Sequence, residues 1–108
     1  MVCLAGAAGT GARYLIALAA PAATLTVNVL GSFAIGAATA WGIRKGWPVS
    51  TLSVITTGFL GGFTTYSAFN HEVTLYLTQG QSVKAAGYAL LMVGACLLAG
   101  LAGLHVAR

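Results

Sequence analysis

The chain has 108 residues, of which 58% are apolar and only 6% are charged. A soluble domain carries about 25% charged residues, so five basic residues and one acid could not cover a globule of this size with a charged surface. The composition therefore argues against a soluble enzyme and against a disordered chain. It also argues against a nucleic-acid-binding protein, since the net charge of +4 comes from scattered side chains without a basic stripe. It predicts an all-α integral membrane protein.

Four segments are long and apolar enough to cross a bilayer, for which about 20 mostly apolar residues suffice. We expect spans at 2–20, 22–43, 50–77 and 83–106. Pro21 is expected in the first turn of the second helix, where proline is tolerated. The segments leave only short turns between them, so residues 1–108 form a single four-helix transmembrane domain.

The basic residues bias the orientation of these spans only modestly. With four crossings, Arg44, Lys45 and Arg108 lie on one side of the membrane and Lys84 on the other. Orientation follows the excess of Lys and Arg in cytoplasmic loops. A chain without a strong preference could insert both ways and pair head to tail, which predicts an antiparallel, dual-topology homodimer.

One face of the second span carries polar and small residues. Its members are four residues apart, at Thr24, Asn28, Ser32, Gly36 and Ala40. Polar groups are costly inside a span, so they indicate either a function or a helix contact. The stripe is a packing seam with an interhelical asparagine bond, or a pore face where the Asn28 amide offers N–H groups to an anion. The second span by itself favours neither alternative.

The middle of the third span combines glycines with threonines, at Gly61, Gly62, Thr64 and Thr65. Glycine costs a helix about 1 kcal/mol relative to alanine, so a break is expected near 61–65. Non-helical backbone at membrane depth must be buried in protein or line a cavity. A broken helix supplies free carbonyls to a cation and free N–H groups to an anion, which makes Gly61–Thr65 a candidate ion site.

Aromatic residues follow on the same stretch with a spacing of three, at Phe63, Tyr66 and Phe69. Such a stripe is most often ordinary packing, but aromatic ring edges are electropositive. Nearby hydroxyl groups belong to Thr64, Thr65 and Ser67. Ring edges, hydroxyls and the Asn28 amide would together form a weakly attractive path for a small anion, without a charge that traps it.

The charged and sulfur-containing side chains of the spans are few. Glu72 is the only acid, and we expect it to be capped or to line water. Arg13 is expected to pair with Glu72 or with backbone carbonyls in a structural role. Cys3 and Cys96 both lie in apolar spans and are interpreted as small packing residues rather than a disulfide or a metal pair.

The segment Gly58–Glu72, GFLGGFTTYSAFNHE, resembles the third-helix signature of the Fluc fluoride channels, also called CrcB proteins. The resemblance extends to Gly11–Tyr14 in the first span, to Thr26–Phe33 in the second and to Tyr88 in the fourth. It covers nearly the whole chain.

The resemblance implies an antiparallel homodimer with two fluoride pores and one central, structural sodium ion. The sodium is held by backbone carbonyls of the break that match Gly61 and Thr64. Fluoride passes an asparagine matching Asn28 and two aromatic positions matching Tyr66 and Phe69. A polar track matches Thr65, Ser67, Glu72 and Tyr88. The arginine matching Arg13 supports the dimer.

Two positions depart from the family pattern. Tyr66 stands where the family usually has phenylalanine, so its contact with the ion is through either the ring edge or the hydroxyl. The fourth span carries no serine or threonine after Tyr88, so the polar track is either shorter or completed by water.

The predicted function is therefore a fluoride-selective channel, not an enzyme, that lets F⁻ leave the cytoplasm passively through the inner (plasma) membrane and so confers fluoride resistance. The alternative is a small multidrug-resistance-type exporter coupled to protons. That mechanism needs a carboxylate in the first span, where Arg13 is the only charged side chain. A third possibility is a membrane subunit that transports nothing.

Overall fold

The computed structural model describes residues 1–20 and 22–108, and all secondary structure in these ranges is helical. The elements are α1 (Val2–Ala19), α2 (Ala23–Lys45), α3 (Val49–Ser53), the π-helical segment η1 (Val54–Leu60), α4 (Gly61–Phe63), α5 (Ser67–Thr78) and α6 (Ser82–Ala107). The expected role of Pro21 lies outside the described residues.

Within the described ranges, α1, α2 and α6 are each long and apolar enough to cross a membrane. The 26 residues of α6 extend about 39 Å at 1.5 Å per residue, which exceeds the ~30 Å hydrocarbon core of a bilayer. Large apolar side chains point outward from these helices, and Leu15, Leu98 and Leu101 are 66%, 69% and 61% exposed. The molecule is therefore an all-α, multi-pass membrane protein.

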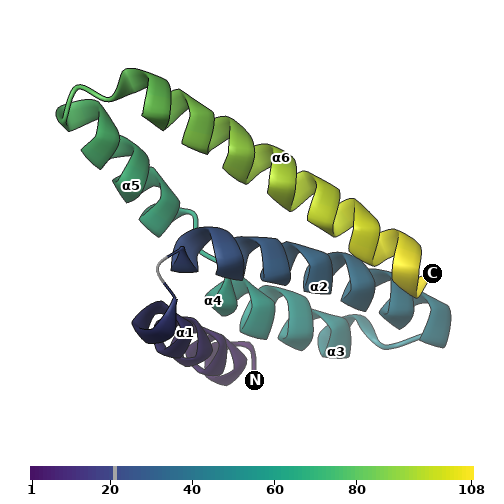
Figure 1. Cartoon of the computed structure of the whole chain (residues 1–108). Coiled ribbons are helices and arrows are strands. Elements are labelled where there is room, and N and C mark those ends of the chain that lie inside the picture. The colour runs from purple at the N-terminus through teal and green to yellow at the C-terminus, as the bar shows by residue number, and fades with distance from the viewer. Residues whose placement is uncertain (21) are drawn as a thin grey trace.

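The third predicted span is not one helix. It consists of α3, η1 and α4 in nearly one line, then a non-helical step at Thr64–Tyr66, then α5 (Figure 1). Gly61 and Gly62 remain helical, so the glycine pair itself does not unwind as expected. Gly62 serves a close helix contact instead, because a Cβ there would collide with the carbonyl of Gly6 on α1.

Glycines also set the contact between α2 and α6, which lie side by side and run in the same direction (Figure 1). A Cβ on Gly36 would collide with the carbonyl of Gly100, and one on Gly103 with the carbonyl of Phe33. Small residues let backbones approach where lipid provides no hydrophobic drive between helices. This contact fixes which α6 side chains face α2.

Two glycines with positive φ end α2 and α5 at the turns expected from the sequence. Gly46 has a φ of 70° and Gly80 a φ of 72°. In each turn the following N–H reaches back to an earlier carbonyl, Trp47 N to Gly42 O at 2.9 Å and Gln81 N to Tyr76 O at 2.8 Å. This pattern is the Schellman motif, which favours glycine at the left-handed position. After the second turn, α6 returns along α5 and over α2.

Candidate ion-binding site

The step between α4 and α5 is held by one side chain of α2. Thr65 N donates to Asn28 Oδ1 at 2.7 Å, and Asn28 Nδ2 donates to Thr65 O at 2.8 Å. Asn28 is only 8% exposed. The amide thus replaces the helical partners of both Thr65 backbone groups. Asn28 makes the bond between helical segments that the first sequence alternative expected, while its role toward an anion stays a prediction.

The break leaves specific carbonyls without their helical donors. In a continuous helix the N–H of Thr65 would reach Gly61 O, but it donates to Asn28. The N–H of Ala68 would reach Thr64 O, but it donates to Thr65 Oγ1 at 3.2 Å. Within the described ranges, no backbone N–H bonds to either oxygen. The break therefore releases the backbone oxygens of Gly61 and Thr64, and it also removes the helical donor of Phe63 O, to which no N–H of the described residues bonds.

Of the two carbonyls between these positions, that of Gly62 is bonded to side chains of α1. Gly62 O accepts from Arg13 Nε at 3.2 Å and from Thr10 Oγ1 at 3.3 Å. Glu72 and a backbone carbonyl were the two partners expected for Arg13, and the structure shows the backbone carbonyl. The guanidinium places positive charge beside the break and ties α1 to it.

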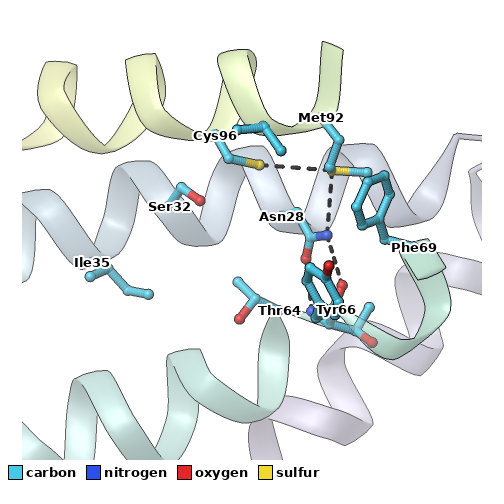
Figure 2. Close-up of a pocket in the computed structure, with 10 residues that line it drawn as sticks. Asn28, Ser32, Ile35, Thr64, Tyr66, Phe69, Met92 and Cys96 are labelled. Carbon is cyan, nitrogen blue, oxygen red and sulfur yellow. Dashed lines mark hydrogen bonds between the residues drawn. The ribbon is translucent and has the colours of Figure 1, made fainter. Parts of the chain in front are cut away.

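A cavity of about 250 Å³ opens beside the break, between α2, α5 and α6 (Figure 2). It is lined by Asn28, Ser32, Ile35, Thr64, Thr65, Tyr66, Phe69, Met92, Val93 and Cys96. Phe69 is buried, whereas Tyr66 is 75% exposed on the single chain. Their rings meet edge to face, with centroids 5.6 Å apart and planes at 75°. Ring edges, an amide and hydroxyls therefore share one space, and none of these side chains carries a fixed charge.

The hydroxyl groups at the start of α5 bond to one another and to the backbone. Thr65 Oγ1 lies 3.2 Å from Ser67 Oγ, and the Thr64 hydroxyl donates to Leu60 O at 3.0 Å. Thr65 and Ser67 therefore form one hydroxyl pair at the break, while Thr64 uses its hydroxyl to end α4.

Glu72 and Tyr88 lie on the far side of Phe69 from Tyr66. The Tyr88 hydroxyl donates to Glu72 Oε1 at 3.0 Å. Phe69 and Tyr88 stack at a tilt with centroids 5.5 Å apart, and Tyr76 meets Tyr88 edge to face at 5.8 Å. Lys84 Nζ sits 4.7 Å from the Tyr76 ring centroid. The rings of Phe69, Tyr88 and Tyr76 thus form a row that leads from the cavity toward the α5–α6 turn, and the middle ring also bonds Glu72.

The sequence analysis missed four residues of the cavity lining, Ile35, Met92, Val93 and Cys96. Asn28 Nδ2 donates its second hydrogen to Met92 Sδ at 3.5 Å, and Cys96 Sγ lies 3.8 Å from the same sulfur. Cys96 is therefore a cavity residue and not only a packing residue. The usable signal was spacing, because Tyr88, Met92 and Cys96 are four residues apart and share one face of α6.

Comparison with known proteins identifies the family of the chain. The family model described as CrcB-like protein, Camphor Resistance (CrcB), matches residues 1–104. The chain belongs to the CrcB family. It is 41% identical over 117 residues to the Fluoride-specific ion channel FluC of Anaeromyxobacter sp. (strain K), an alignment that covers 100% of this chain and 93% of the relative.

Two further relatives carry the same name. The protein of Granulibacter bethesdensis is 42% identical over 116 residues, covering 94% of this chain and 88% of the relative. The protein of Deinococcus radiodurans is 46% identical over 83 residues, covering 77% and 66%. These CrcB relatives are named as ion channels, so the expectation of a protein that is not an enzyme is confirmed. The names also favour a channel over the proton-coupled exporter considered from the sequence.

Proposed function

We propose that this CrcB-family chain is a fluoride channel that lets F⁻ leave the cytoplasm down its electrochemical gradient. The observation that carries the proposal is the broken helix pinned by Asn28 beside an uncharged, ring-lined cavity. The full-length similarity to proteins named fluoride-specific ion channels supports the choice of ion.

The Asn28 amide limits how fluoride would be bound. Its oxygen and one N–H are already used by Thr65, so only the second N–H, on the Met92 sulfur, is available for exchange. A thioether is a weak acceptor, whereas fluoride is a small and strong one. We infer that fluoride takes the place of the Met92 sulfur on Asn28 while the Thr65 bonds stay intact.

The rest of the proposed path uses weak contacts. The edges of Tyr66 and Phe69 offer partial positive charge, and Thr65, Ser67, Glu72 and Tyr88 provide the polar groups at its two ends. None of the cavity side chains is cationic. Conduction requires a site that an ion can leave as readily as it enters, and a lining without fixed positive charge meets that requirement.

We further propose that two chains associate antiparallel around one sodium ion held by Gly61 O and Thr64 O. The donor set fits, because sodium prefers oxygen ligands and unwound carbonyls supply them in membrane proteins. The loss of the helical donors of both carbonyls supports this assignment. When bound, the ion would supply positive charge to these oxygens, while Arg13 holds the intervening Gly62 carbonyl on α1.

The proposed membrane arrangement has four crossings in the inner (plasma) membrane, with the segment from α3 to α5 as the broken third crossing. The hydrophobic surfaces of α1, α2 and α6 support insertion. Both insertion directions are consistent with the weak charge bias of the turns.

Fluoride efflux from liposomes containing only the purified protein tests the function. Vesicles loaded with potassium fluoride are treated with valinomycin, and an electrode follows the F⁻ released. We expect rapid release that needs no proton gradient, with chloride released at least 100-fold more slowly. Release no faster than from protein-free vesicles, or release only with a proton gradient, would contradict the proposal.

A further inference from the structure

Two sulfur atoms meet in the wall of the cavity. Met92 and Cys96 lie one turn apart on α6, and their Sδ and Sγ atoms are 3.8 Å apart. Figure 2 shows both side chains directed from α6 toward Asn28 and Ser32 of α2. Met92 is 4% exposed, so its position is fixed by its surroundings, whereas Cys96 is half-buried.

The two sulfurs are close enough to share one metal ion. At a metal–sulfur distance of about 2.3 Å, the observed spacing would give an S–metal–S angle of about 110°. The near-linear arrangement that silver and cuprous ions prefer with two sulfur donors needs a wider separation, which rotation of the half-buried Cys96 side chain provides without a change in the backbone of α6. Thiolate and thioether groups are soft donors that select soft, monovalent copper-type ions over hard ones.

The described residues do not provide the set of ligands that a zinc ion usually requires. No group of three or more His, Cys, Asp or Glu side chains converges in residues 1–20 and 22–108, and such groups are what zinc sites usually require. Silver and cuprous ions form stable complexes with only two sulfur donors. The chemistry of the pair thus points to this class of cation.

Cys96 is also reachable from a second direction. Besides the Asn28 cavity, it borders an adjoining hollow of about 320 Å³, whose lining includes Ser32, Gly36, Leu97 and Gly100. Ser32 and Cys96 are common to both spaces. An ion entering through either one would meet the thiol before the buried thioether.

We propose that Cys96 and Met92 form a binding site for a soft monovalent cation, silver or cuprous, that blocks the ion path beside Asn28. The Cys96 S–H bond breaks and its proton passes to water as the sulfur–metal bond forms. Met92 contributes a lone pair, and no electron is transferred. The bound ion then occupies the Met92 sulfur, at the place where the second Asn28 N–H is available. Block of fluoride flux rests on the proposed function, whereas binding does not.

Binding is tested first, on the full-length protein in detergent. The titration uses the Cys3→Ser background, because the exposed thiol of α1 would itself bind silver. Native mass spectrometry and titration with silver nitrate are expected to give one tightly bound silver ion per chain in this background. Adding Cys96→Ser should abolish it, and adding Met92→Leu should weaken it at least tenfold. No silver bound to the Cys3→Ser protein, or one ion retained after Cys96→Ser is added, would overturn the site. Cys96→Ala repeats the comparison if the serine variant does not fold.

Block is then measured by fluoride release in nitrate buffers free of chloride, with each variant compared with itself before silver is added. Micromolar silver should slow release at least tenfold in the wild type and in Cys3→Ser, and less than twofold in Cys96→Ser. Equal inhibition of wild type and Cys96→Ser would refute the block. If the untreated wild type releases no fluoride, the channel function fails, while the binding titration still decides the sulfur site.

Discussion

Replacing Asn28 with aspartate tests whether the amide holds the break open in its observed form. The variant keeps an oxygen that accepts from Thr65 N but loses the N–H that donates to Thr65 O at 2.8 Å. A buried acceptor left without its donor costs about 1–3 kcal/mol. The new carboxylate also lies at a position that is 8% exposed, where an unpaired charge costs several kcal/mol more.

The expected result is a fluoride release at least 100-fold slower than in the wild type and a lower unfolding temperature in detergent. The negative charge repels the anion, and the unsatisfied Thr65 carbonyl loosens the step between α4 and α5. The matched control is Gln79→Glu, the same amide-to-acid change at an exposed residue of the turn after α5. It should leave the unfolding temperature within 2 °C or so, since surface substitutions change stability by about 0.5 kcal/mol or less.

The reasoning is refuted if Asn28→Asp behaves like Gln79→Glu in both measurements, because the paired bonds to Thr65 would then contribute nothing. Loss of stability with normal fluoride release in the folded fraction would refute the placement of Asn28 in the ion path.

Three further changes probe the rest of the molecule. Gly103→Ala places a methyl group against the Phe33 carbonyl, so we expect a lower unfolding temperature. Its control is Gly94→Ala on the same helix, which meets open space and gains up to about 1 kcal/mol of helix propensity. Equal changes in unfolding temperature for the two variants would argue against the α2–α6 contact. Tyr88→Phe removes the hydroxyl 3.0 Å from Glu72 Oε1 and keeps the ring, so fluoride release should fall roughly tenfold, which is worth about 1.4 kcal/mol, while Tyr14→Phe on the exposed face of α1 should match the wild type. Replacing sodium with N-methylglucamine should lower the thermal stability of the dimer measured by cross-linking, and a dimer indifferent to the replacement would contradict the assignment of Gly61 and Thr64.

The sequence by itself determined the class of protein and the approximate position of its helices. Apolar runs, the basic turn after α2 and the polar turn after α5 are local features, and hydrophobicity acts on them wherever the helices pack. The Gly-Thr stretch also located the break to within a few residues, because helix-weakening residues act on their own segment. The resemblance of Gly58–Glu72 to a known signature identified the family, which comparison of the whole chain then confirmed.

Tertiary structure decided how the break is stabilised and what faces it. Asn28 and Thr65 are 37 residues apart and Asn28 and Met92 are 64 apart, so their contacts depend on how α2, α5 and α6 dock. The break starts at Thr64 rather than at Gly61 because Asn28 takes the Thr65 N–H, while Gly62 is used to pack against α1. The sulfur pair became visible for the same reason, since the glycine contacts between α2 and α6 turn Met92 and Cys96 toward Asn28.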